Sequence, residues 1–138
     1  MPGGGTYALV LELLDSATVE VGALGEREFP PGGYAYVGSA LGTGGFSRVD
    51  RHGRLAAGES DVRHWHVDYL TGHPDSRLRA VVLAPGADVE CAAARELPPG
   101  PVPGFGASDC DCRSHLAHRA PWSDLLATVR DLYARLAD

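Results

Sequence analysis

The sequence contains no lysine, isoleucine, asparagine or glutamine. Lysine, isoleucine and asparagine have A/T-rich codons, so their absence indicates a GC-rich genome. All twelve basic residues are consequently arginines. A single arginine is therefore a weak sign of an anion site, and only an arginine that belongs to a larger pattern supports an argument.

Long apolar runs are also missing. No stretch approaches the roughly 20 apolar residues that span a bilayer. The first residues, Met-Pro-Gly-Gly-Gly, have neither the basic start nor the apolar run of a secretory signal. These absences argue against a membrane protein and predict a cytoplasmic one. The length of 138 residues, 44% of them hydrophobic, fits a single domain over residues 1–138.

Cysteine is scarce: only Cys91, Cys110 and Cys112 are present. Without an export signal, a disulfide framework is not expected. Together with His115, the three thiols would form a Cys₃His zinc site by residue type. The Cys-x-Cys spacing is tighter than in a usual zinc finger, and reduced cysteines are often plain core residues. Structural zinc and core thiols therefore both stay open.

Acidic residues outnumber basic ones, 18 to 12, which gives a formal net charge of −6. This balance argues against broad, non-specific attraction to nucleic acid. The distribution is uneven, because residues 41–85 carry six arginines against five acids, whereas residues 1–40 carry one arginine against five acids. The middle of the chain is thus the candidate to face an anionic partner.

Three apolar segments predict strands, at residues 7–14, 34–37 and 78–83. The turn signal Pro30-Pro31-Gly32-Gly33 precedes the second, which favours antiparallel, hairpin-type pairing.

Four segments predict helices. They are residues 44–52, with Thr43 as cap and Gly53 as stop; residues 61–70; residues 88–97, capped by Asp88; and an amphipathic C-terminal helix over 122–136. The order of elements predicts an α+β fold in which helices flank a small central sheet.

Two short motifs carry tyrosines on predicted strands: Gly5-Thr6-Tyr7 and Tyr36-Val37-Gly38. Strand tyrosines commonly fill cores. Here the neighbouring glycines leave backbone room beside both side chains. A tyrosine hydroxyl can orient or deprotonate a water, so the pair is a candidate for hydrolytic chemistry.

Arg48 and His52 follow on a predicted helix, four residues apart and hence on one face. A guanidinium can hold a phosphate by two hydrogen bonds, and an imidazole can carry a proton near neutral pH. Arg51 and Arg54 lie on other faces, where they are either solvated or steer phosphates.

These motifs, in this order and spacing, resemble the GIY-YIG nuclease superfamily, with Thr6 and Val37 in place of the two isoleucines. The blocks Tyr-Val-Gly-Ser-Ala, His-Trp-His-Val-Asp-Tyr-Leu, Glu-Cys and Gly-Phe-Gly-Ala-Ser-Asp-Cys resemble the Uri-type endonuclease branch. Related domains occur attached to endonuclease III-like repair proteins. The resemblance implies a three-stranded antiparallel sheet flanked by helices and a single-metal hydrolytic site on one face.

The resemblance also implies roles for single residues. Glu90 would hold Mg²⁺ or Mn²⁺, since a carboxylate is a ligand that these ions prefer, although an acid in a first helical turn can simply complement the helix dipole. The expected catalytic residues are Tyr7, Tyr36, Arg48, His52 and His66, and the expected nucleic-acid contacts are Ser39, Arg51, Arg54 and Ser108.

His64 and His66 leave two alternatives. On a helix their side chains diverge by about 200°, whereas on an extended segment they share a face. We expect one of them to point into the site and assist Tyr7, and Asp68 to be available to orient a histidine.

The sequence thus predicts a metal-dependent endonuclease that hydrolyses DNA in repair or processing, with DNA favoured over RNA. It predicts no membrane partner, and a repair protein is the expected protein partner. The alternative is a non-catalytic nucleic-acid-binding or protein-docking accessory domain, with structural zinc as one variant of it.

Overall fold

The computed structural model describes residues 4–40, 45–59, 66–98, 100–102, 105 and 114–136. Its main sheet has four strands in the order β5-β1-β4-β6, and each neighbouring pair is antiparallel. The strands are β1 (Gly5–Leu13), β4 (Gly32–Ser39), β5 (Ser76–Pro85) and β6 (Leu116–Arg119). A separate ribbon pairs β2 (Ala17–Glu20) with β3 (Glu26–Phe29) around the 3₁₀ turn η1 (Gly22–Leu24).

The predicted α+β class is confirmed, whereas the predicted three-stranded sheet is wrong. The additional strand is β6, which pairs with β4 from Tyr36 opposite Leu116 to Gly33 opposite Arg119. Its sequence, Leu-Ala-His-Arg, has two apolar residues followed by two basic ones, and so lacks the period-two alternation by which a strand is recognised. The long-range pairing with β4 therefore decides its conformation.

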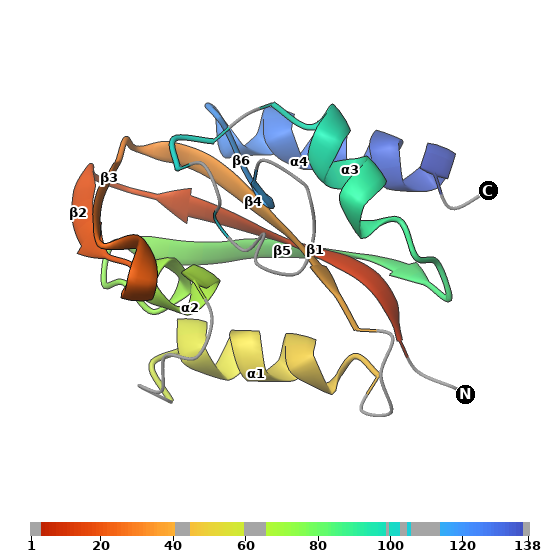
Figure 1. Cartoon of the computed structure of the whole chain (residues 1–138), viewed down its shortest axis with the longest axis horizontal. Helices are drawn as coiled ribbons and strands as arrows, with labels where there is room; N and C mark the ends of the chain where they lie inside the picture. The colour runs from red at the N-terminus through yellow and green to blue at the C-terminus, as the bar shows by residue number, and fades with distance from the viewer. Residues whose placement is uncertain are drawn as a thin grey trace.

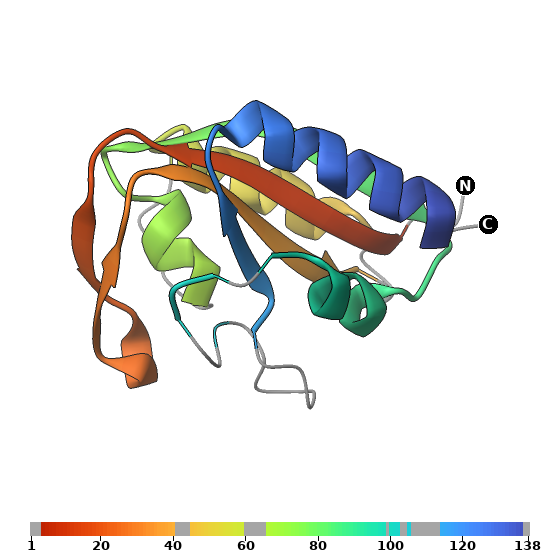
Figure 2. The same ribbon diagram turned by 90° about the horizontal axis from the view of Figure 1, so that it is seen from above.

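Helices cover both faces of this sheet, which gives three layers (Figure 1). One face carries α1 (Ser47–Ala56) and α2 (His66–Thr71), and the other carries α3 (Glu90–Glu96) and α4 (Trp122–Leu136). Seen from above, α4 lies along the direction of β1 (Figure 2). The amphipathic C-terminal helix is thus confirmed. None of the helices in the described part of the chain is long and apolar enough to cross a membrane.

Strand alternation divides the core between the two layers of helices. Along β1, Tyr7, Leu9 and Leu11 belong to the apolar cluster that includes Val67 of α2, whereas Ala8 belongs to the cluster that includes Leu125 and Val129 of α4. Successive strand residues point to opposite faces, so one residue of shift in β1 would exchange the two sets. Tyr7 therefore lies on the side of α1 and α2.

The end of α1 differs from the prediction, because the helix continues through Gly53 to Ala56. Leu55 is buried and holds the last turn against the core. The stop is Gly58, whose φ of 79° is in the left-handed region. The Gly58 N–H donates to Leu55 O at 3.1 Å and the Glu59 N–H to Arg54 O at 2.9 Å, the two bonds of a Schellman end.

The start of α3 is held from a distance. Asp88 was expected to cap it, but the residue at the cap is Val89. The Val89 N–H donates to Thr6 Oγ1 at 3.0 Å, and that hydroxyl donates to Ala87 O at 2.8 Å. A side chain of β1 therefore fixes where α3 begins. For α2, the predicted first half at residues 61–65 lies outside the described residues.

Candidate active site

The predicted site residues Tyr7 and His52 meet in the core between β1 and α1. The Tyr7 hydroxyl and His52 Nε2 are 2.9 Å apart and hydrogen-bonded. Their side chains are almost fully enclosed, with 1% of Tyr7 and 0% of His52 exposed. A tyrosine and a histidine that lie 45 positions apart in the sequence thus form one buried pair.

Gly38 of the second motif makes room for the Tyr7 ring. It lies directly opposite Tyr7 in the β1–β4 register. A Cβ at this position would be 2.9 Å from Tyr7 Cε1 and closer still to the ring carbon Cζ and the hydroxyl oxygen. From the other face of the sheet, Tyr133 of α4 donates its O–H to the Tyr7 carbonyl oxygen at 2.7 Å. The tyrosine is therefore positioned both at its ring and at its backbone.

Asp68 of α2 stands behind the histidine. Its Oδ1 lies 3.9 Å from His52 Nδ1, and none of its side chain is exposed. Arg51 holds this carboxylate with two hydrogen bonds, from Nη1 to Oδ1 at 3.1 Å and from Nη2 to Oδ2 at 2.8 Å. A carboxylate near Nδ1 favours the tautomer with its proton on Nδ1, which leaves Nε2 to accept the Tyr7 proton.

Burial shifts the pKa values of both Tyr7 and His52. Burial raises the pKa of Tyr7 well above its usual value; the neighbouring Tyr36, Glu90 and Asp68 raise it further, and Arg48 opposes them. Burial lowers the pKa of His52 to about 4, although the Asp68 carboxylate opposes that shift. At neutral pH both groups are therefore uncharged, and the resting site holds a neutral tyrosine hydrogen-bonded to a neutral imidazole.

Arg48 lies in the first turns of α1, on the exposed side of the site. Its Nη1 donates to the Ser39 carbonyl oxygen at 2.6 Å, which ties the guanidinium to the end of β4. The positive charge of Arg48 lowers the pKa of both Tyr7 and His52, so it acts on the buried pair. The structure thus brings Arg48 and Ser39 together beside the predicted catalytic residues.

Tyr36 lies beside the buried pair, whereas His66 is separated from it by Phe105, whose ring centroid is 6.4 Å from that of Tyr36. The Tyr36 ring centroid is 6.4 Å from that of Tyr7 and 6.3 Å from that of His52. The His66 ring lies 5.6 Å from Phe105, and burial lowers its pKa. Of the histidines in the described part of the chain, His52 is the one hydrogen-bonded to Tyr7.

The remaining arginines predicted to contact nucleic acid differ in their surroundings. The Arg51 guanidinium is occupied by Asp68, and the hydrogen bond to that carboxylate raises the pKa of Arg51. Arg54 is exposed in the last turn of α1. Ser108 lies outside the described residues.

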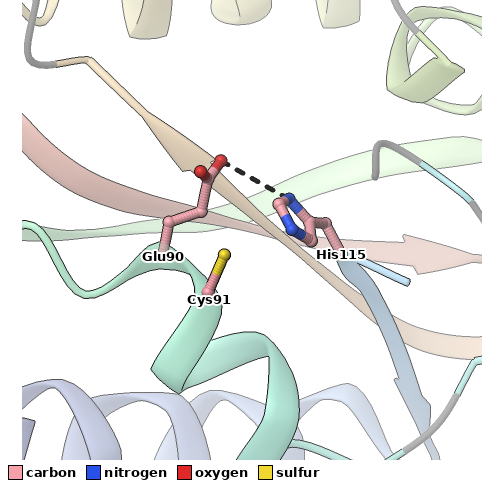
Figure 3. A group of neighbouring side chains, drawn as sticks. All are labelled: Glu90, Cys91 and His115. Atoms are coloured by element: carbon pink, nitrogen blue, oxygen red, sulfur yellow. Dashed lines mark ion pairs between the residues drawn. The ribbon is translucent and has the colours of Figure 1, made fainter. Parts of the chain in front are cut away.

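A second cluster combines residues that the sequence had assigned to two separate metal sites. Glu90 and Cys91 at the start of α3 lie beside His115, which precedes β6 (Figure 3). Glu90 Oε2 is 3.4 Å from His115 Nδ1. One ligand atom from each of the three residues lies within 4.8 Å of the others. Cys110 and Cys112, the other expected zinc ligands, lie outside the described residues.

Asp68 and Tyr133 are the residues whose part in the site the sequence did not define. Asp68 was expected to orient a histidine, but its pairing with Arg51 joins α1 to α2 across 17 positions. The hydrogen bond from Tyr133 to Tyr7 spans 126 positions. An acid among the apolar residues of a predicted helix is a further signal that could have been used for Asp68, because a buried charge needs a partner.

A family model described as "Domain of unknown function DUF123" matches residues 6–138. The chain belongs to this DUF123 family. No curated protein and no solved structure matched the chain. The match extends from Thr6 to the C-terminus and so includes the tyrosine–histidine pair and the Glu90 cluster.

Proposed function

We propose that this DUF123 chain is a divalent-metal-dependent endonuclease of the GIY-YIG type that hydrolyses DNA phosphodiester bonds in repair or processing. The observation that carries the proposal is the Tyr7–His52 hydrogen bond, together with the charges of Arg48 and Glu90 that act on the same Tyr7 hydroxyl. An acid–base pair, a cation and a carboxylate around one hydroxyl suit phosphodiester hydrolysis.

In the proposed reaction, a water attacks the phosphorus and the bond to the leaving sugar oxygen breaks. The water gives its proton to the Tyr7 oxygen while the Tyr7 proton passes to His52 Nε2. Asp68 then stabilises the imidazolium, as a carboxylate behind a histidine does in other proton relays. The leaving alkoxide takes up a proton and departs as the sugar alcohol. His52 releases the proton that it accepted through the Tyr7 hydroxyl, so the resting pair is restored.

Arg48 and Tyr36 would contact the phosphate. The Arg48 guanidinium is exposed and already oriented by Ser39, so it can neutralise the charge that develops on the non-bridging oxygens. A phosphate ester bound there would contact Arg48 from solvent, and the side chains that enclose Tyr7 would have to shift before it reached the Tyr7 hydroxyl. Ser39, Arg54 and Ser108 are proposed to contact the DNA backbone beyond the cut bond.

Glu90 is the proposed ligand of the divalent metal. A quarter of its side chain is exposed, so an ion with attached substrate oxygens can reach it. One carboxylate together with phosphate oxygens and waters suits Mg²⁺ or Mn²⁺. When bound, the metal would supply Lewis-acid stabilisation of the phosphate oxygens.

The partner is proposed to be DNA in preference to RNA, delivered or retained with the help of a repair protein. The net charge of −6 supports the need for such help, because an acidic protein gains little non-specific affinity for a polyanion.

Cleavage of labelled single-stranded, duplex and branched DNA with Mg²⁺, Mn²⁺ or EDTA tests this function. We expect metal-dependent cutting that falls about 10²- to 10³-fold in Arg48→Ala, because a transition-state contact is lost, and that disappears in Glu90→Ala. Arg130→Ala and Glu96→Ala are the matched controls, since both residues are exposed on α4 and α3.

Full cutting by both Arg48→Ala and Glu90→Ala would sink the site assignment. DNA binding without cutting, equal in wild type and variants, would instead identify an accessory module. Each variant is first compared with the wild type by circular dichroism, so that a loss of cutting is attributed to the site and not to unfolding.

A further inference from the structure

The cluster of Glu90, Cys91 and His115 contains three different kinds of metal ligand. They come from two segments, the first turn of α3 and the residue before β6, and converge on one another (Figure 3). A carboxylate oxygen, a thiol sulfur and an imidazole nitrogen lie within 4.8 Å of one another. Such a mixed set is not needed to complement a helix dipole or to fill a core.

The backbone of both segments is fixed independently of any ion. Thr6 binds two residues that come just before the start of α3, at Ala87 O and Val89 N. His115 donates its N–H to Phe105 O at 2.8 Å and accepts the Val37 N–H at 2.9 Å. The ligand-bearing residues are therefore held in place by the sheet, which reduces the entropy lost when an ion binds.

The separations fit a small tetrahedral ion. Ligand atoms about 2.0–2.3 Å from a tetrahedral zinc lie roughly 3.3–3.8 Å from one another. The distance from Glu90 Oε2 to His115 Nδ1, 3.4 Å, is already in this range. Cys91 can reach this range by a contraction of at most about 1.0–1.5 Å from the 4.8 Å limit of the cluster.

The chemistry of the donors discriminates between ions. Mg²⁺ binds oxygen ligands and would use Glu90 alone, whereas thiolate and imidazole select zinc and its neighbours. We propose that Glu90, Cys91 and His115 are three ligands of one zinc ion. The inference does not depend on nuclease activity, because it concerns the binding of the metal alone. If it holds, zinc replaces the Mg²⁺ or Mn²⁺ proposed above at Glu90, and zinc would supply the Lewis-acid stabilisation of the phosphate oxygens.

Zinc binding is measured on the full chain, without nucleic acid, by competition with a chromophoric chelator. We expect one zinc per chain, and at least tenfold weaker binding in each of Glu90→Gln, Cys91→Ser and His115→Gln. Glu96→Gln on the same helix and His118→Gln in β6 are the matched controls and should bind as the wild type does.

Cobalt(II) supplies a separate readout for the sulfur ligand. In the variant Cys110→Ser/Cys112→Ser, Cys91 is the remaining thiol, so a thiolate-to-cobalt charge-transfer band there must come from Cys91. We expect this band, and we expect its loss when Cys91→Ser is added. His115 is buried and its variant could fail to fold, so Cys91→Ser, which replaces a half-buried side chain with one of nearly the same size, carries the test in that case.

Three results would overturn the inference: a wild-type chain without stoichiometric zinc binding, undiminished zinc affinity in Cys91→Ser, or no charge-transfer band in the Cys110→Ser/Cys112→Ser variant. Zinc binding with no DNA cutting would support the inference while contradicting the proposed nuclease. DNA cutting without zinc binding would do the reverse.

Discussion

The hydroxyl of Tyr133 in α4 donates a hydrogen bond of 2.7 Å to the backbone carbonyl of Tyr7 in β1, across 126 positions of sequence. Both side chains are buried, Tyr133 on the α4 side of the sheet and Tyr7 on the α1 side. The last helix is therefore joined by a polar contact to the strand residue on which the candidate site is built.

Tyr133→Phe removes this hydrogen bond, so the buried Tyr7 carbonyl oxygen loses one of its donors. We expect the free energy of unfolding to fall by about 1–2 kcal/mol, measured by urea denaturation. Tyr69→Phe is the control, because no hydrogen bond of its hydroxyl is found within the described residues. Equal stability of wild type and Tyr133→Phe would show that the contact contributes nothing net.

Gly38→Ala and Gly53→Ala should have opposite effects. A methyl group at Gly38 collides with the Tyr7 ring, whereas one at Gly53 has no neighbour within 4 Å. We expect Gly38→Ala to lower the free energy of unfolding by about 1–3 kcal/mol and to displace the Tyr7 hydroxyl from His52. Gly53→Ala should raise it by about 0.5–1 kcal/mol, since Gly53 lies inside α1. Thermal unfolding of both variants and the wild type measures these changes. A Gly38→Ala protein as stable as the wild type would contradict the close contact between Gly38 and the Tyr7 ring.

His52 should make stability depend on pH. Its pKa is about 4 in the folded chain, below the value of about 6.5 for an unfolded histidine, so the unfolded state binds more protons between these values. The stabilising contribution is complete above the unfolded pKa and is lost as pH falls toward the folded one. From pH 7 to pH 5 we expect a loss of about 2 kcal/mol.

The measurement is the free energy of unfolding of wild type and His52→Gln at both pH values. The variant should show a smaller difference between pH 7 and pH 5, whereas His118→Gln, with a partly exposed ring, should behave as the wild type does. The same pH dependence in His52→Gln and wild type would exclude His52 as its source.

Arg51→Ala tests whether Arg51 serves the fold. The substitution leaves the fully buried Asp68 carboxylate without its bidentate partner. We expect a loss of about 3 kcal/mol, at the lower end for a broken buried pair because a quarter of Arg51 is exposed. Adding Asp68→Asn should recover part of this loss, since the buried carboxylate charge is then removed as well. An Arg51→Ala protein as stable as wild type would refute the structural role.

Arg54 offers the contrasting case, because it is exposed on the same helix. Arg54→Ala should change stability by less than about 0.5 kcal/mol. If Arg54 contacts a DNA phosphate as proposed, the slope of log affinity against log salt should become shallower by about 0.9. Fluorescence anisotropy over a salt series measures this slope, with Arg130→Ala on α4 as the control. An unchanged slope would remove Arg54 from the proposed DNA contacts.

Local patterns in the sequence predicted most of the elements correctly. The apolar runs in β1 and β5 and the amphipathic spacing of α4 are strong because each extends over many residues. Features fixed by distant partners were not predictable in the same way. Strand β6 depends on pairing with β4, and α1 passes Gly53 because Leu55 is buried beyond it.

In the candidate site, too, the residues belonging to sequence motifs were predictable, whereas their contacts with distant residues were not. Tyr7, Arg48 and His52 could be selected because they belong to one ordered pattern of motifs. Their surroundings could not be foreseen, because the Asp68–Arg51 pair joins two helices and Glu90 meets His115 across 25 positions of sequence. Residue types indicated a carboxylate site and a thiol–imidazole site separately, and only the folded chain brings them to one place.

The hydroxyl of Thr6 binds the segment that leads into α3, while the next residue, Tyr7, points to the opposite face and meets His52. Consecutive Cα atoms are about 3.8 Å apart across a rigid, planar peptide unit. The start of α3, which carries Glu90, and the Tyr7 side chain are therefore positioned by adjacent residues of β1. One peptide unit thus sets the spacing between these two anchors, whatever the packing of the outer helices.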